Sequence, residues 1–277
     1  MEIPADLTSL VDGDILRFEI GYGAETGWRG VTEGEEAIPP WSWVEAMLHS
    51  RLTNICRAVS TTVKPRIFLT EGHTFRHDIA TTKPYKGTRI SKKPWHYENL
   101  TVYMRDVLGA EIVTHIETDD KLAIEQVSSN NTTIICTRDK DLRQVPGWLY
   151  SWELGKQAAF GPTFIENPGT IELVNGKIKA TGLLSFYAQL LTGDTVDNIP
   201  GLPGCGPVGA YEILTSEEPE YYTYNLIERI ENEYYKYNGE GYSDFVPHLL
   251  EQGRLVWMTR KLHPDGTPVL WEIGMEE

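Results

Sequence analysis

The chain contains 277 residues, of which 40% are hydrophobic, and it carries a net charge of −15. This length allows one large domain or two with a substantial core. The sequence has neither an apolar run of about 18 residues nor a basic-then-apolar start, so we expect no membrane span and no signal peptide. The three cysteines, Cys56, Cys136 and Cys205, are far apart, which predicts neither a disulfide framework nor a zinc site and fits the reducing cytoplasm.

The predicted elements alternate between strands and helices. Residues 21–40 are rich in Gly, Glu and Pro and are predicted to form a loop. Four short apolar runs are predicted to be buried strands: residues 7–11, 65–70, 111–116 and 132–137. Helical periodicity marks residues 41–62, 92–108, 121–127 and 183–191. Because strands alternate with helices, we predict an α/β fold with a mainly parallel central sheet flanked by helices.

Further elements follow the fourth strand. Residues 148–152 are expected to add a fifth strand, and residues 171–179 form a hairpin because Asn175-Gly176 is a strong hairpin-turn signal. A new helical pattern starts at Ala210. Residues 217–244 hold eight acids, two bases and seven tyrosines, and we expect a peripheral acidic helix pair or loop there.

Each of the four strand runs is followed by acidic residues. In a parallel sheet the carboxyl ends of the strands share one edge, where α/β proteins bind ligands. The topology therefore gathers the acids at the strand ends, and two more acids can join them from the helix at 183–191. An all-oxygen set without Cys or His favours Mg²⁺ or Mn²⁺ over zinc. The predicted ligands are Asp12, Glu71, Glu117, Asp119, Asp120, Asp139, Asp141, Asp194 and Asp197.

A structural interpretation competes with this metal site. A single Asp at a strand end is usually a helix cap or a turn former, and Asp119-Asp120 fits the first turn of a helix. The metal hypothesis depends on the recurrence of acids at four successive strand ends.

A loop rich in Gly and Pro follows Asp197 and leads into the helix at Ala210. Such a helix start exposes backbone N–H groups and suits a phosphate. The run from Gly204 to Gly209 also matches G-x-G-x-x-G, but no strand precedes it, so we reject a dinucleotide site. Residues 51–93 contain ten Lys or Arg and two acids, which makes this segment either a phosphate-contacting face or a chance-biased solvated surface.

Taken together, these motifs resemble the 5′-nuclease family, which includes bacteriophage 5′→3′ exonucleases and flap endonucleases. The resemblance covers roughly residues 7–215 and is carried by short segments in family order. These are residues 11–14, Thr70-Glu71 with Phe75-Arg76, residues 85–89, 117–120, 139–142 and 193–210. It implies a PIN-like nuclease core, a short helical arch at about 83–110 and a helix–three-turn–helix DNA-binding element at about 190–214.

The resemblance also implies roles for individual residues. Lys86, Arg76 and Arg89 would face the scissile phosphate, with Asp139 and Asp141 taking part in catalysis through bound metal. Two or more Mg²⁺ ions are implied, replaceable by Mn²⁺, with K⁺ held at the helix–three-turn–helix. Val208 departs from the family because relatives often have a basic residue there. The implied DNA contacts are Tyr85, Lys86, Arg89, Lys92, Lys93, Gly201, Gly204, Gly206 and Gly209.

The resemblance therefore implies a metal-dependent enzyme that hydrolyses DNA from 5′ ends, a 5′→3′ exonuclease with structure-specific flap endonuclease activity, in phage replication, RNA primer removal or DNA degradation. Expected partners are double-stranded DNA with 5′ ends, nicks or flaps and RNA–DNA hybrids, for a monomeric cytoplasmic protein that binds no membrane. We expect a nuclease core over 1–180 and a helical DNA-binding region over 181–277. Two alternatives remain, a PIN-like RNase and a catalytically weak protein that binds DNA structures.

Overall fold

The computed structural model describes residues 3–28, 38–89, 92–216, 222–238 and 242–275. The chain forms two compact units, each built from separated stretches. Unit 1 comprises Met1–Gly72, Ile90–Asp139 and Gly147–Phe164, and unit 2 comprises His73–Arg89, Lys140–Pro146 and Ile165–Glu277. This division differs from a boundary near residue 180, and each unit is described by itself below.

Unit 1 is built on a six-stranded sheet in the order β3-β2-β1-β4-β5-β6. The central strand β1 pairs in parallel with β2 and β4, and β4 pairs in parallel with β5. The mainly parallel sheet flanked by helices is therefore confirmed. The strands are β1 (Thr8–Asp12), β2 (Arg66–Thr74), β3 (Glu111–His115), β4 (Thr133–Cys136), β5 (Gly147–Ser151) and β6 (Phe160–Ile165).

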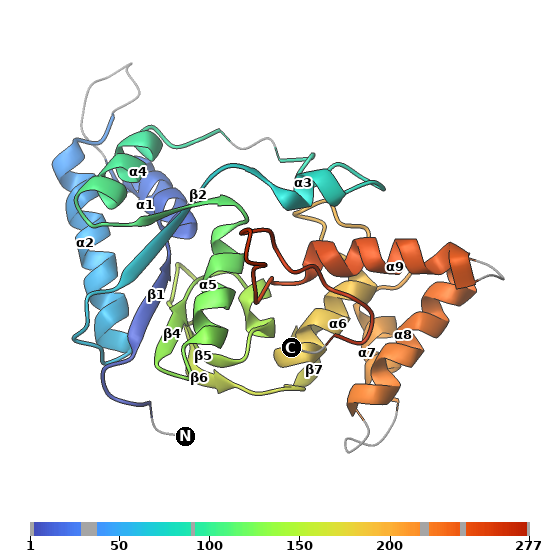
Figure 1. Cartoon of the computed structure of the whole chain (residues 1–277). Helices are drawn as coiled ribbons and strands as arrows, with labels where there is room; N and C mark the ends of the chain where they lie inside the picture. The colour runs from blue at the N-terminus through green and yellow to red at the C-terminus, as the bar shows by residue number, and fades with distance from the viewer. Residues whose placement is uncertain (1–2, 29–37, 90–91, 217–221, 239–241, 276–277) are drawn as a thin grey trace. The chain divides into compact units, whose positions relative to one another are not determined.

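Both faces of this sheet are covered by helices, as Figure 1 shows. One face contributes Val11, Ile67 and Cys136 to a core shared with α1 (Gly13–Gly27), α2 (Trp41–Ala58) and α4 (Tyr97–Asp106). The alternate residues of the same strands, such as Leu10 and Ile135, are also buried. They face the side on which α5 (Thr118–Ser128) packs against β1 and β4. Burial on both faces explains why these strands are continuous apolar runs.

Three boundaries in unit 1 differ from the predictions. Residues 21–27 continue α1 rather than forming a loop, and residues 29–37 of that predicted loop lie outside the described residues. Gly21 fits this helix because Pro94 packs so closely that an added Cβ would lie 2.5 Å from the proline ring. Helix α4 is shorter than the predicted 92–108, and β2 runs past Glu71 to Thr74.

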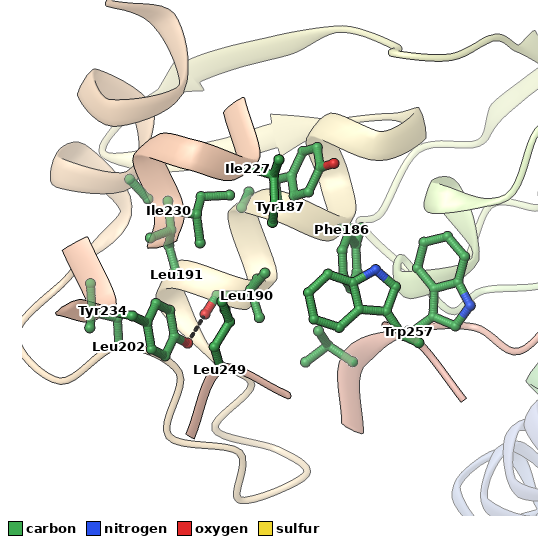
Figure 2. Packing of buried hydrophobic residues seen from close by; sticks show 14 of the residues in the cluster. Phe186, Tyr187, Leu190, Leu191, Leu202, Ile227, Ile230, Tyr234, Leu249 and Trp257 are labelled. Carbon is green, nitrogen blue, oxygen red and sulfur yellow. Dashed lines mark hydrogen bonds between the residues drawn. The ribbon is translucent and has the colours of Figure 1, made fainter. Parts of the chain in front are cut away.

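Unit 2 is mainly helical, and Figure 2 shows the centre of its core. Phe186, Leu190 and Leu191 of α6 pack with residues of the later helices, and the buried Tyr234 hydroxyl donates to the Leu190 carbonyl at 2.6 Å. The predicted hairpin is confirmed as the antiparallel pair β7 and β8. Besides α6 (Gly182–Thr192), the elements are α3 (Phe75–Ile79), the 3₁₀ helix η1 (Asp141–Gln144), β7 (Ile171–Val174), β8 (Lys177–Ala180), α7 (Pro207–Thr215), α8 (Tyr222–Asn238) and α9 (Tyr242–Val256).

The loop between α6 and α7 is folded tightly on itself. Gly193 and Gly201 both have positive φ, and a Cβ on Gly201 would lie 2.2 Å from the Gly193 nitrogen. The Leu202 amide donates back to the Leu191 carbonyl at 2.9 Å. Helix α7 begins at Pro207, three residues before the predicted start, because proline is favoured in the first turn.

In the described part of the predicted acidic segment, α8 (Tyr222–Asn238) forms and α9 begins at Tyr242 before continuing past residue 244, while residues 217–221 and 239–241 are not described. The described residues of the whole chain contain no helix of the length and apolarity that a bilayer crossing requires.

Candidate metal and nucleic-acid site

The acids of unit 1 lie at the carboxyl edge of the sheet. Asp12 is the last residue of β1, and Asp139 follows the end of β4. The start of α5 lies beside β2, because the Thr118 amide donates to the Thr70 hydroxyl at 2.8 Å. This contact brings Glu117 to the same edge. Asp12 and Glu117 are 1% and 8% exposed, so the fold holds carboxylates here that water barely reaches.

Asp12 is the most constrained of these side chains. Its Oδ1 accepts a hydrogen bond from the Ile15 amide at 3.0 Å as the N-cap of α1, and its Oδ2 accepts one from the Thr137 hydroxyl at 2.7 Å. Burial, together with the nearby charges of Asp14 and Asp139, raises the pKa of Asp12 to about 7. A divalent cation would offset the free-energy cost of ionising the buried Asp12, because a cation favours the ionised form of every carboxylate around it.

Other predicted ligands in unit 1 have structural contacts. Glu117 and Asp120 form a capping box at the start of α5, in which the Glu117 amide donates to Asp120 Oδ2 at 3.1 Å. Asp120 is fully buried in that role, which supports the structural interpretation for this residue. Asp119 lies in the first turn of α5. Glu71 is exposed within β2 and does not end the strand.

In unit 2, Asp141 and Asp194 share a cationic partner. The Lys140 ammonium lies 3.0 Å from Asp194 Oδ2 and 3.4 Å from Asp141 Oδ1. The Gln189 amide donates to Asp141 Oδ1 at 2.5 Å. Burial alone would raise the pKa of Asp194, but the Lys140 charge and the amides of Val196 and Asp197 hold that pKa below its usual range. Asp194 is therefore a buried carboxylate that stays ionised.

Within unit 2, Asp197 connects the α6–α7 loop to the segment that carries Lys86 and Arg89. Its carboxylate accepts a hydrogen bond from the Tyr85 hydroxyl at 2.9 Å and forms an ion pair with Arg89. The Lys86 ammonium lies 4.0 Å away, and the Lys86 amide donates to the Asp197 carbonyl at 2.9 Å. Asp197 thus holds Lys86 and Arg89 in place, and Tyr85 is buried as their support rather than displayed to a ligand.

Arg76 has a different position from the one expected for a phosphate contact. Its side chain is 1% exposed, and its guanidinium donates to the carbonyls of Leu255 and Trp257 at 3.0 and 2.7 Å. These carbonyls lie at the end of α9, where a cation is favourable. We therefore assign Arg76 to the packing of unit 2.

The glycines of the α6–α7 loop differ in accessibility. Gly201 is buried, and its amide donates to the buried Gln252 side chain at 2.9 Å, so this N–H is not free for a ligand. Gly204 and Gly206 are exposed, Gly209 is half-buried, and Val208 is 49% exposed in the first turn of α7. The exposed part of the loop is thus the start of α7.

Two lysines that fall within the predicted arch, Lys92 and Lys93, belong to unit 1. Lys92 and Lys93 are exposed, and the Lys93 ammonium lies 3.1 Å from Glu98 and 4.1 Å from the centre of the Tyr97 ring.

Across the described residues, no group of three or more His, Cys, Asp or Glu side chains is arranged to hold a metal ion. The acids at the carboxyl edge of unit 1 are nevertheless the donor type that a hard cation prefers, since they are all carboxylates and Asp12 among them is buried.

Sequence reasoning missed three side chains that contact the predicted ligands, namely Thr137, Lys140 and Gln189. The strand register gives the signal for Thr137, because Val11 pairs with Cys136 and the next residues are Asp12 and Thr137. The partnership of Gln189 with Asp141 spans 48 residues, and no local pattern indicates it.

Comparisons with solved structures define the fold. The bacteriophage T5 5′-exonuclease with bound zinc shares 15% identity, with a TM-score of 0.59 over 91% of this chain and 89% of that chain. The T5 D15 protein co-crystallised with metal ions shares 13% identity, with a TM-score of 0.55 over 92% and 90%. The T5 D15 flap endonuclease in a complex with DNA and metal ions shares 12%, with a TM-score of 0.52 over 90% and 86%.

No family model matches this sequence, and no curated protein sequence matches it. The chain is an α/β protein with carboxylates at the carboxyl edge of its parallel sheet. More particularly, it has the fold of the 5′-nucleases.

Proposed function

We propose that this chain is a divalent-metal-dependent nuclease that hydrolyses DNA at 5′ ends, as a 5′→3′ exonuclease with flap endonuclease activity. The observation that carries the proposal is the buried Asp12 at the carboxyl edge of the sheet, in a fold shared with the T5 5′-exonuclease. Keeping a carboxylate ionised at a ligand-binding edge that water barely reaches costs much free energy unless a cation lies beside it.

In unit 1, the proposed metal ligands are Asp12, Glu117 and Asp139. In unit 2, the proposed ligands are Asp141 and Asp194. Asp119 and Glu71 are additional candidates, and Asp120 acts through its cap. Bound Mg²⁺ or Mn²⁺ would supply Lewis-acid activation of water and neutralise charge on the phosphate.

The residues of the chain itself have separable roles in this proposal. Lys86 and Arg89 place positive charge toward the scissile phosphate, and Asp197 orients both of them through its carboxylate. Gly204, Gly206 and Gly209 allow a duplex backbone to approach the N–H groups at the start of α7. Lys92 and Lys93 add phosphate contacts, so binding should depend on salt and tolerate sequence changes. We keep K⁺ at the α6–α7 loop as a proposal.

The test compares 5′-labelled duplex, nicked, flapped, RNA–DNA hybrid and single-stranded RNA substrates in Mg²⁺, with the Asp139→Ala and Asp141→Ala variants as controls. We expect the wild-type chain to release 5′-end products, EDTA to stop cleavage, and both variants to lose most activity. Cleavage that persists at the wild-type rate in both variants would show that the metal assignment is wrong. Cleavage of single-stranded RNA alone would favour the RNase alternative. DNA binding without cleavage would favour the alternative of a DNA-structure-binding protein.

A further inference from the structure

We propose that Thr137 is a positioning residue whose hydroxyl fixes the Asp12 carboxylate for metal binding, an inference that rests on the proposed function. Thr137 follows β4 directly and is fully buried. Its side chain is none of the predicted ligands, yet it contacts one ligand and the backbone of another. The two hydrogen bonds of the Thr137 hydroxyl determine where its proton points.

The direction of the hydrogen bonds follows from counting donors. The Asp139 amide donates to Thr137 Oγ1 at 2.9 Å, so the hydroxyl oxygen is an acceptor there. A hydroxyl has one proton, and the partner left for it is Asp12 Oδ2 at 2.7 Å. The Thr137 hydroxyl therefore donates to Asp12 and favours its ionised form.

The sheet places this contact where the strand order reverses. β1 pairs with β2 on one side and with β4 on the other, so the ends of β1 and β4 flank the switch point. Parallel sheets bind ligands at that position. Val11 pairs with Cys136, and both lie on the face covered by α1, α2 and α4. Because successive residues of an extended chain alternate in direction, the residue after each lies on the face that carries α5. Asp12 and Thr137 are thus neighbours by register.

Both oxygens of Asp12 are held in this arrangement. Oδ1 accepts from the Ile15 amide at 3.0 Å and Oδ2 from Thr137, so the plane of the carboxylate is fixed, while each oxygen keeps a lone pair for a cation. The bond from the Asp139 amide also fixes the turn that carries Asp139. One hydroxyl thereby sets the positions of two proposed ligands, and such outer contacts commonly change metal affinity about 10- to 100-fold.

The same strand offers a matched control. Thr133 begins β4, lies on the same face as Thr137 and is 8% exposed. Its hydroxyl bonds with Gln126 Oε1 at 2.6 Å and Ser129 Oγ at 2.7 Å. Thr133→Val removes a buried hydroxyl from the opposite end of the strand, where no predicted ligand contacts it.

The experiment uses the full chain with Thr137→Val, Thr137→Ser and Thr133→Val. Mn²⁺ affinity is measured by calorimetry without DNA, the melting temperature is measured for each variant, and single-turnover cleavage of a 5′ flap is measured separately. We expect Thr137→Val to weaken Mn²⁺ binding about 10- to 100-fold, Thr137→Ser to restore it within about threefold, and Thr133→Val to leave it unchanged.

Wild-type Mn²⁺ affinity in Thr137→Val, or an equal loss in Thr133→Val, would overturn the proposal. Loss of affinity in a folded Thr137→Ser would also overturn it, because the hydroxyl is retained. If Thr137→Val does not fold, Thr137→Ala serves as the second variant with the same expectations. The proposed function fails separately, if the wild-type chain binds Mn²⁺ but cleaves no DNA.

Discussion

The ammonium of Lys140 lies 3.0 Å from Oδ2 of the buried Asp194. The same group lies 3.4 Å from Asp141. Lys140 thus pairs with two proposed metal ligands. A divalent cation that binds the same oxygens would have to compete with this ammonium.

Lys140→Met should therefore tighten Mg²⁺ or Mn²⁺ binding. The lysine is 65% exposed, and exposed ion pairs contribute little, so we expect only about a two- to fivefold gain in affinity. Calorimetric titration of Mn²⁺ measures it, with Lys156→Met as a control because Lys156 is an exposed lysine of unit 1. Weaker binding in Lys140→Met would mean that the lysine assists the metal rather than competing with it.

Lys86→Ala should slow cleavage much more than it weakens DNA binding. Removing one preorganised positive group near a reacting phosphate should cost on the order of 10²- to 10³-fold in turnover. Single-turnover rates and binding of a flap substrate in Ca²⁺ separate the two effects. Lys83→Ala is the control on the same loop, since Lys83 is exposed. Equal losses of rate and affinity would make Lys86 a binding residue only.

Metal affinity should rise with pH up to neutrality. Burial and the Asp14 charge raise the pKa of Asp12 from 3.8 to about 7. The folded state therefore keeps this proton longer than the unfolded state, so the Asp12 contribution to stability is present below pH 3.8 and is lost as pH rises to about 7. Mg²⁺ needs the ionised form, and its affinity should rise about tenfold per pH unit below the pKa.

Asp14→Asn tests this assignment. Asp14 is the second cause of the raised pKa, so its neutralisation should move the pH midpoint of metal binding downward. Mn²⁺ titrations from acid to neutral pH give the midpoint, with Asp78→Asn as an exposed control in unit 2. An unshifted midpoint in Asp14→Asn would show that another group titrates.

Val208→Lys should strengthen duplex binding. Val208 is 49% exposed in the first turn of α7, next to the accessible glycines. One added phosphate contact should steepen the slope of log affinity against log salt by about 0.9. Val196→Lys is the matched control, because Val196 is 61% exposed in the preceding loop. If both variants change the slope equally, the effect is general charge and not contact at α7.

The sequence predicts those parts of the candidate site that depend only on which residues follow each strand along the chain. Parallel strands share a carboxyl edge, so the positions of Asp12, Glu117 and Asp139 at that edge could be derived from strand ends alone. The hairpin at Asn175-Gly176 was equally local. The strand Phe160–Ile165 was not predicted, because Gly161 and Pro162 interrupt its apolar pattern.

Long-range partners could not be derived. Arg76 bonds with the Leu255 carbonyl 179 residues away, and Tyr85 bonds with Asp197 112 residues away. Basic residues in such positions have the same local pattern whether they contact phosphate or carbonyl groups. The capping role of Asp120 likewise requires knowing that α5 starts at Thr118.

Unit 2 is built from three separate segments of the chain, and this limits which fragments of the protein can fold alone. A fragment beginning near residue 181 would lack Tyr85, which belongs to the core of that unit, and Gln144, whose amide donates to the Val256 carbonyl at 2.9 Å. Without these two residues the core of unit 2 would lose packing and a buried hydrogen bond. Biochemists who seek a minimal DNA-binding fragment should therefore expect insoluble material from such a truncation and should work with the intact polypeptide.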